Sequence, residues 1–347
     1  MTNVEANPDE LTCTTETCAE AIEVITPRDV PLGGPRAMTV RRTLPQRKRS
    51  LIGPWCFVDH FGPDDVALSG GMAVARHPHT GLATVTLLFD GTIEHIDSTG
   101  FANEVRPGEV NLMIAGSGVS HSEYSSAQTI ELHGVQLWYA LPDDLRHGMP
   151  QSQHYVARPQ AVPGGTVLTY LGEAAGVRAD IDTRVPATAA EVRVHTGASV
   201  TLDLDAADEH GLLLDSGSLT VEVDGAAGTV EREITPDELA YLPPGARRLT
   251  LRASDEAPVR AVLIGGAPFG EDIVMWWNFI GRTHEEIVEY RRAWMAEIDR
   301  EPSSVPEPGG TYDDGTEFPR FGTFPPDTPA ALPAPTLPNV RIRPRKH

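Results

Sequence analysis

The sequence predicts an all-β protein built from two tandem β-barrels, with a short helix and an extended tail near the C-terminal end. From residue 30 onward, short runs rich in valine, isoleucine, threonine and leucine alternate with glycines and prolines. This pattern is typical of short strands joined by turns, and it favours a closed barrel or sandwich over a parallel sheet. The second half weakly repeats the first, which indicates two copies of one unit.

Changes in composition divide the chain into four parts. Eleven of the thirty prolines lie between Pro302 and Pro344, so we expect an extended arm there, lying on the surface or on a partner. The predicted parts are a flexible N-terminal extension (1–27), a first barrel (28–160), a second barrel that ends in a helix (161–297) and the proline-rich arm (298–347).

The strongest turn signal in the first barrel is Asp90-Gly91, which separates the runs ATVTLLF and TIEHID. Asp-Gly between two strand-like runs predicts a two-residue hairpin. A second hairpin is expected between EVNLMIA and LHGVQLWYAL. In the second half, HGLLLDSGSLTVEV resembles the first hairpin, with Gly217 in the place of Gly91, and TPDELAYLPPGARRLTL resembles RPGEVNLMIAGSGVSHS.

The second barrel is expected to end in a helix that begins after Thr283. Thr283 and Glu286 have the spacing of a capping box, in which the two side chains bond each other's backbone N–H groups. The apolar residues that should pack this helix on a barrel are Ile287, Tyr290, Trp294 and Met295.

Two short motifs, His77-Pro78-His79 and His121-Ser122-Glu123, carry the main functional signal. Residues i and i+2 of a strand point to the same side. If the two strands are neighbours, three imidazoles and one carboxylate converge on one point inside the barrel. Each motif alone is weak, since most such tripeptides hold surface or hydrogen-bonded histidines, but their joint occurrence predicts a metal site.

The ligand types narrow the choice of metal. Structural zinc sites prefer thiolates and a closed shell, whereas histidine and carboxylate sets with open positions suit oxygen chemistry. Fe(II) is therefore the leading candidate, and Ni, Co, Cu and Zn remain alternatives.

Three further histidines lie near these motifs in the sequence. His95 shares a strand face with Asp97, so it either orients a metal ligand or faces solvent. We expect His133 to be buried and hydrogen-bonded in a structural role, and we assign no ligand role to His60.

The second half lacks the ligand set. Aligning Gly217 with Gly91 puts Asp203 and Asp205 in the places of the first histidine pair, and the second motif becomes Thr250 and Arg252. An arginine repels a cation, so we expect this barrel to be structural and without metal.

The charge balance argues against binding to nucleic acid or anionic membranes. Asp and Glu number 49 against 28 Lys and Arg, which gives a formal net charge of −21, and such a surface repels phosphates. The basic C-terminal cluster of Arg341, Arg343, Arg345 and Lys346 is expected to be a solvated end.

The chain lacks an apolar segment long enough to span a membrane, and its start lacks the apolar core of a signal peptide. We therefore expect a cytoplasmic protein. Its three cysteines, Cys13, Cys18 and Cys56, form no disulfide framework, which fits a reducing compartment. Cys13 and Cys18 could form a metal clip or redox pair, although incidental thiols are the simpler interpretation.

At these residues the chain resembles the pirin family, two-barrel (bicupin) proteins of the cupin superfamily. The resemblance covers residues 28–296. It implies an iron-type metal in the N-terminal cupin barrel, bound by His77, His79, His121 and Glu123, and a C-terminal cupin barrel without metal. The motifs that carry it are VPLGGPRAMTVRRTLPQ, GPWCFVDHFGP, HPHTGLATVTLLFDGTIEHIDSTG, VRPGEVNLMIAGSGVSHSE, LHGVQLWYALP and GGAPFGEDIVMWWNFIGRTHEEI.

The resemblance implies two functions of different classes. Some pirins resemble flavonol dioxygenases that cleave quercetin, and then Glu123 would accept a proton from a flavonol-like substrate that reacts with O2. Others are metal-dependent partners of transcription regulators or metabolic enzymes, and then the oxidation state of iron would control a protein partner. Some pirins carry a bulky aromatic residue and a glutamate where this chain has Leu82 and Ala83. Of the properties that the resemblance implies, the identity of the substrate is therefore the one least readily extended from those pirins to this chain.

Overall fold

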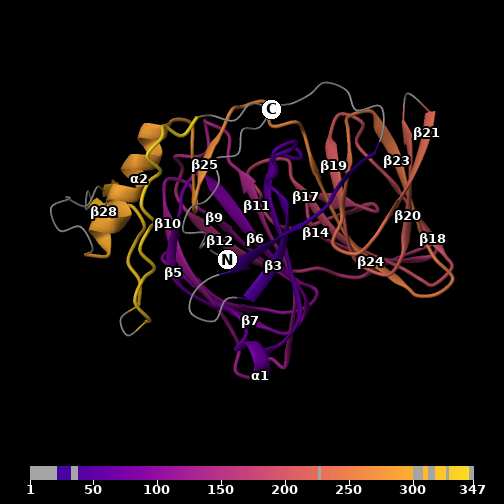
Figure 1. Ribbon diagram of the computed structural model, residues 1–347, viewed down its shortest axis with the longest axis horizontal. Helices are drawn as coiled ribbons and strands as arrows, with labels where there is room; N and C mark the ends of the chain where they lie inside the picture. The colour runs from indigo at the N-terminus through magenta and orange to yellow at the C-terminus, as the bar shows by residue number, and fades with distance from the viewer. Residues whose placement is uncertain are drawn as a thin grey trace.

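The protein folds into two β-barrels that lie side by side, the N-terminal one indigo to magenta and the C-terminal one mostly orange in Figure 1. The computed structural model describes residues 22–32, 38–225, 228–299, 308–311, 317–325 and 328–343. The predicted all-β fold with two tandem barrels and a C-terminal helix is confirmed. Cys13, Cys18, Arg345 and Lys346 lie outside the described residues.

The N-terminal barrel consists of a seven-stranded and a four-stranded antiparallel sheet. The larger sheet has the order β12 (Gln151–Val156), β9 (Glu109–Ile114), β6 (Leu82–Asp90), β11 (Glu131–Ala140), β4 (Trp55–Asp65), β3 (Met38–Leu44) and β2 (Arg28–Leu32). The smaller sheet has the order β5 (Ala73–His79), β10 (Val119–Ser125), β7 (Ile93–Asp97) and β8 (Ala102–Val105).

The C-terminal barrel repeats this arrangement strand for strand. Its larger sheet has the order β1 (Glu23–Ile25), β22 (Leu239–Leu242), β19 (Glu209–Ser216), β24 (Val259–Gly266), β17 (Thr188–Val194), β14 (Gly165–Leu171) and β13 (Gln160–Val162). Its smaller sheet has the order β18 (Ser199–Asp203), β23 (Ala246–Ala253), β20 (Leu219–Gly225) and β21 (Gly228–Ile234).

The remaining described elements are short, apart from one helix. They are α1 (Val66–Ser69), β15 (Glu173–Ala174), β16 (Val177–Arg178), β25 (Val274–Trp276), β26 (Phe279–Gly281), α2 (His284–Glu297), β27 (Pro308–Thr311) and β28 (Glu317–Pro319). Among the described residues, none of the helices has the length and apolar character that crossing a membrane requires.

Two of the expected domain boundaries lie next to strands of the second barrel. The N-terminal extension was expected to be flexible through residue 27, yet β1 pairs with β22 of the C-terminal barrel, Val24 opposite Ala240. It takes the edge position that β12 holds in the first barrel. The expected junction after residue 160 falls inside β13, whose first residue already belongs to the second barrel.

The predicted strands exist, but the predicted hairpins are wrong. The runs on either side of Asp90-Gly91 form β6 and β7, which belong to different sheets. Likewise β9 pairs with β6 and β12 rather than with β11, and β19 and β20 around Gly217 lie in different sheets. Gly91 has φ 84°, so the Asp-Gly turn is present, but it carries the chain across the barrel instead of back along the same sheet.

The two larger sheets pack against each other and bury a shared core. This core combines Val85, Leu87 and Leu137 of the first barrel with Leu213 and Ile264 of the second. Alternate residues of the same strands point into their own barrels, so these strands are buried on both faces. Such double burial explains the nearly continuous apolar runs in the sequence.

Helix α2 packs on the outer side of the N-terminal barrel, and the C-terminal segment runs between it and strands β5 and β10 (Figure 1). The predicted capping box of Thr283 and Glu286 is present. Phe321 of the arm is fully buried against Trp294 of the helix. The Ser120 hydroxyl of β10 donates a hydrogen bond to the Phe321 carbonyl at 2.8 Å, so the arm is attached directly to a strand of the predicted site.

We predict that Glu297, which contacts the arm, makes the stability of the folded protein sensitive to pH. Burial raises the pKa of Glu297 to about 7, and its carboxyl accepts a hydrogen bond from Phe321 N at 3.2 Å. Because the folded pKa exceeds the unfolded one, its contribution to stability is complete at acidic pH and is lost as the pH rises through about 7. Relative to Glu297→Gln, the wild type should lose up to about 3 kcal/mol of unfolding free energy between pH 5 and 8.

Urea unfolding at both pH values measures this difference. The exposed Glu233→Gln substitution is the matched control and should unfold like the wild type at each pH. An identical pH dependence in wild type and Glu297→Gln would contradict the prediction.

Candidate metal centre

Strands β5 and β10 bring the two sequence motifs together inside the N-terminal barrel. They pair antiparallel with His77 directly opposite His121. The side chains of His77, His79 and His121 are fully buried, and Glu123 is 1% exposed. A bulge between His121 and Glu123 shifts the register of this pair, and bulges of this kind re-aim side chains next to functional sites. Residues predicted from i, i+2 spacing therefore do share one interior.

The hydrogen bonds of the histidines leave their Nε2 atoms available as ligands. His77 Nδ1 lies 2.9 Å from the Ala75 carbonyl and His79 Nδ1 lies 3.2 Å from the Asn278 carbonyl. A carbonyl only accepts, so each Nδ1 carries the hydrogen and each Nε2 carries the lone pair. His77 Nε2 is buried without a hydrogen-bond partner, a costly state for a polar atom unless a further ligand binds it.

The distance between His79 Nε2 and His121 Nε2 also indicates a metal site. His79 Nε2 and His121 Nε2 lie 3.0 Å apart. The His77, His79 and His121 donor atoms all lie within 4.8 Å of one another. A cation between them would be bound by lone pairs that otherwise repel, so these residues fit a divalent metal.

Burial also keeps these histidines in their neutral, ligating form. Removal from water disfavours the charged imidazolium, and it lowers the pKa of His77 to about 3. Burial likewise holds the pKa values of His79 and His121 well below the ordinary value. No proton therefore competes with a metal for these nitrogens near neutral pH.

Glu123 is oriented by a polar network that the sequence analysis missed. Thr86 Oγ1 lies 3.1 Å from Glu123 Oε1 and 2.9 Å from Gln136 Oε1. A hydroxyl has one hydrogen, and Gln136 Nε2 is without a partner, so the amide is better assigned the other way round. Gln136 then donates to Thr86, which donates to Glu123. The available signal was a glutamine that, with His133, interrupts the apolar strand LHGVQLWYAL.

Two further residues that contact His79 come from distant parts of the chain. The carbonyl that orients His79 belongs to Asn278, between β25 and β26. Trp138 of β11 packs edge-on against His79 with ring centroids 5.0 Å apart. Leu82 and Ala83, where some pirins differ, are both fully buried, so they shape the packing around β6 instead of an exposed wall.

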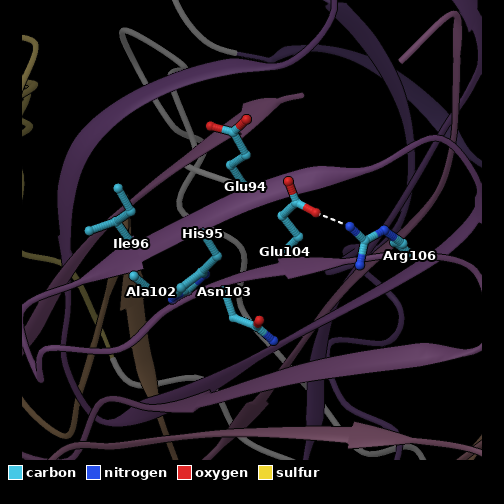
Figure 2. Close-up of a pocket in the computed structure, with 7 residues that line it drawn as sticks. All are labelled: Glu94, His95, Ile96, Ala102, Asn103, Glu104 and Arg106. Carbon is cyan, nitrogen blue, oxygen red and sulfur yellow. Dashed lines mark hydrogen bonds and ion pairs between the residues drawn. The ribbon is translucent and has the colours of Figure 1, made fainter. Parts of the chain in front are cut away.

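His95 reaches the same interior from the neighbouring strand β7. It lies opposite Glu123 in the β7–β10 pairing, is 3% exposed, and its Nε2 is 3.0 Å from Asp97 Oδ2. The solvent-facing alternative is therefore wrong. His95 also borders an open cavity of about 420 Å³ along β7 and β8, where Figure 2 shows it on the opposite side of the strands from Glu94 and Glu104. The other lining residues are Ile96, Ala102, Asn103 and Arg106.

A second group of metal-type side chains lies between the barrels. His60 and His133 of the first barrel both contact Asp215 of the second, at 2.9 and 2.6 Å. His133 is buried and hydrogen-bonded, as expected, whereas the contacts of His60 had no local sequence signal. Asp215 and its partners thus join the two larger sheets.

Hydrogen bonding argues against a metal in this second group. Arg260 NH2 lies 3.4 Å from His133 Nδ1. A guanidinium only donates, so His133 Nδ1 carries the lone pair and Nε2 carries the hydrogen that Asp215 accepts. Burial alone would raise the pKa of Asp215, but hydrogen bonds from both histidines and the charge of Arg260 hold this pKa well below the ordinary value. The group is therefore an ionic link between barrels.

The C-terminal barrel has an aliphatic interior at the corresponding place. The expected substitutes Asp203, Asp205 and Arg252 are exposed, and Thr250 pairs with the exposed Thr201. Residues on the other face of these strands point inward; they are Val200, Leu202, Leu249 and Leu251. The sequence alignment thus selected the outer face, because a shift of one residue reverses every side chain of a strand.

Two jelly-roll barrels in tandem, one with a buried histidine and carboxylate cluster and one with an aliphatic interior, define a bicupin. Residues 37–139 match the Pirin family and residues 189–297 match the Pirin C-terminal cupin domain. The chain belongs to the pirin family.

Named relatives agree with this assignment. The chain is 40% identical over 274 residues to a Pseudomonas aeruginosa protein named "Putative quercetin 2,3-dioxygenase PA1205", covering 79% of this chain and 83% of that one. It is 32% identical to a pirin-like protein of Caulobacter vibrioides, covering 74% and 88%. The crystal structure of a quercetin 2,3-dioxygenase from Acinetobacter baumannii superposes with a TM-score of 0.79 at 30% identity, covering 94% and 98%.

We predict that metal binding separates the two histidine groups. His121→Ala should lose bound metal because it removes one of the converging Nε2 atoms. His133→Gln should keep the wild-type metal content because its site is satisfied by hydrogen bonds alone. Metal analysis after reconstitution and desalting checks both, and loss of metal in His133→Gln would contradict the assignment.

A second prediction concerns the ionic link. Asp215→Ala leaves His60, His133 and Arg260 without their shared acceptor, and breaking a buried ion pair costs about 3–5 kcal/mol. The matched control is Asp203→Ala, whose side chain is 93% exposed and whose removal should leave stability nearly unchanged. Urea denaturation of both variants measures the difference, and equal unfolding midpoints would count against the link.

Proposed function

We propose that the N-terminal barrel binds one divalent metal, Fe(II) in the first instance, through His77, His79, His121 and Glu123, and that this site is a flavonol 2,3-dioxygenase centre. The observation that carries the proposal is the convergence of imidazole lone pairs beside a buried carboxylate. With three nitrogen ligands and one oxygen ligand, positions remain for substrate and O2. Ni, Co, Cu and Zn are alternatives that the same ligands accept.

The chemistry divides between the metal and the protein. Bound Fe(II) would lower the pKa of a coordinated enol and supply electrons for the reaction with O2. Glu123 accepts the enol proton of the flavonol, acting as general base. The Thr86 hydroxyl fixes this carboxylate through Oε1, and Gln136 fixes Thr86. The surrounding barrel excludes bulk water from the site.

The relatives support the choice of substrate class. The 40% identical Pseudomonas aeruginosa protein and the structurally similar Acinetobacter baumannii enzyme both carry quercetin 2,3-dioxygenase in their names. A planar polyphenol with an acidic enol suits a site that offers a base and open metal positions. Leu82 belongs to the same buried cluster as Trp138, which packs against His79, so we expect a residue change at position 82 to alter the preferred flavonol.

A second function, metal-dependent binding of a protein partner, is favoured by the arm. Arg76 and Ser120, next to the ligands His77 and His121, hydrogen-bond the carbonyls of Gly322 and Phe321. A change in ligand geometry between Fe(II) and Fe(III) would therefore reach the surface formed by the arm and α2. The partner would be a transcription regulator or a metabolic enzyme, and pull-down at both oxidation states tests this function.

We predict that Glu123→Gln abolishes turnover while retaining some metal. The amide keeps an oxygen toward the metal but cannot take the enol proton, so the rate should fall by about 10²–10⁴-fold. Oxygen uptake by anaerobically iron-loaded protein given quercetin measures this. The control is His121→Ala, in which both metal and uptake should be lost.

Three outcomes are informative. Uptake that requires quercetin, iron and His121 supports the dioxygenase. Undiminished uptake by Glu123→Gln removes Glu123 from the reaction. Absence of uptake by protein with iron bound refutes the dioxygenase proposal and leaves the partner-binding function.

A further inference from the structure

The carboxylate of Asp97 on strand β7 is buried and accepts four hydrogen bonds. It is 1% exposed, and its Oδ1 accepts hydrogen bonds from Thr99 N at 2.8 Å and Thr99 Oγ1 at 2.6 Å. Its Oδ2 accepts one from Ser152 Oγ of β12 and one from His95 Nε2 at 3.0 Å. These bonds lower the pKa of Asp97 even though burial would raise it. The carboxylate therefore stays an acceptor.

This acceptor determines the tautomer of His95. Because Asp97 can only accept, His95 Nε2 carries the hydrogen, and in the neutral ring Nδ1 is left with the lone pair. His95 Nδ1 lies 3.5 Å from His121 Nδ1, with the two ring centroids 5.0 Å apart. The lone pair of His95 thus faces the distal nitrogen of a proposed ligand.

The same logic then reaches His121. When a metal is bound at His121 Nε2, the hydrogen of His121 lies on Nδ1, and the lone pair of His95 is placed to accept it. Without metal, His121 Nε2 can instead donate its hydrogen to the lone pair of His79. That Nε2 is the atom 3.0 Å from His79 Nε2. His77 and His79 obtain the same tautomer from backbone carbonyls, whereas a side chain on another strand supplies the acceptor for His121.

We propose that Asp97 and His95 are positioning residues that fix His121 in its metal-binding tautomer, through the chain Asp97–His95–His121. The strand register supports this order, since Asp97 lies opposite His121 and His95 lies opposite Glu123. His95 donates to Asp97 and accepts from His121, so its two nitrogens are both used and it is not itself a ligand. The inference rests on the proposed metal centre but is independent of dioxygenase activity.

The alternative is that His95 binds a metal directly. Its Nδ1 lies near His121 Nδ1 and Glu123, and these three could hold a cation. That arrangement would take the His121 lone pair at Nδ1 and put its hydrogen on Nε2, toward His79. The two arrangements require opposite tautomers of His121, so a single measurement separates them.

The test is long-range ¹H–¹⁵N correlation NMR of the zinc-loaded wild-type protein labelled at histidine, with the metal-free protein as the reference. The ¹⁵N shifts distinguish protonated from unprotonated ring nitrogens. In the zinc-loaded protein we expect His121 with hydrogen on Nδ1 and His95 with hydrogen on Nε2. Relative to the metal-free protein, Nε2 and not Nδ1 of His121 should shift strongly, together with Nε2 of His77 and His79. Zinc bound at His121 Nδ1, or a His95 hydrogen on Nδ1 in the zinc-loaded protein, would overturn the proposal, whether or not the protein oxidises quercetin.

Variants test the consequence for affinity. His95→Leu removes the acceptor, and loss of such a supporting residue should weaken zinc binding about 10–100-fold. His95→Gln offers an amide oxygen to His121 and should restore most of the affinity. The control is His154→Leu, because His154 is an exposed histidine that bonds Asn111 on the neighbouring strand. This variant should bind zinc like the wild type.

Melting temperatures of the metal-free variants show whether they fold. Equal zinc affinity of His95→Leu and wild type, or equal weakness of the Gln and Leu variants, would refute the positioning role. A zinc stoichiometry that falls from two to one in His95→Leu would make His95 a ligand instead.

Discussion

The register between β5 and β10 is the constraint on which the site depends. It sets His77 opposite His121, and the alternation of side chains then directs all four proposed ligands into the barrel. A slip of one residue would turn them outward and put their neighbours inside. The outer neighbours Arg76 and Ser120 are bound by the arm, so the arm fixes the same register from the other side.

The proposed ligands could be predicted from the sequence, but the residues that contact them could not. His77, His79, His121 and Glu123 are adjacent in pairs, so a local rule about strands was enough to group them. Gln136 acts across strands, and Asn278 acts from the end of the second barrel. Their contacts depend on sheet order, which no local pattern encodes.

The order of strands in the sheets also explains why the predicted hairpins were wrong. An Asp-Gly turn indicates that the chain reverses at Gly91, but the next strand can return beside the first or cross to the facing sheet. Here it crosses. The error at Thr250 and Arg252, which were aligned with inward-pointing residues, has a related cause. Two short repeats can be aligned by their composition, but composition does not show which side chains point inward. The cluster at Asp215 joins residues of both barrels, so it lay beyond any single-segment analysis.

The edge position of β1 has a consequence for how the molecule is made. β1 leaves the ribosome long before β22, its hydrogen-bonding partner, so the second barrel can be completed only by reaching back to the start of the chain. Each barrel folded alone would be imperfect: the first would lack the Asn278 carbonyl beside His79, and the second would expose the unpaired edge of β22. Exposed edges of this kind invite association between chains, so a segment that precedes the first barrel in the sequence protects the edge of the second.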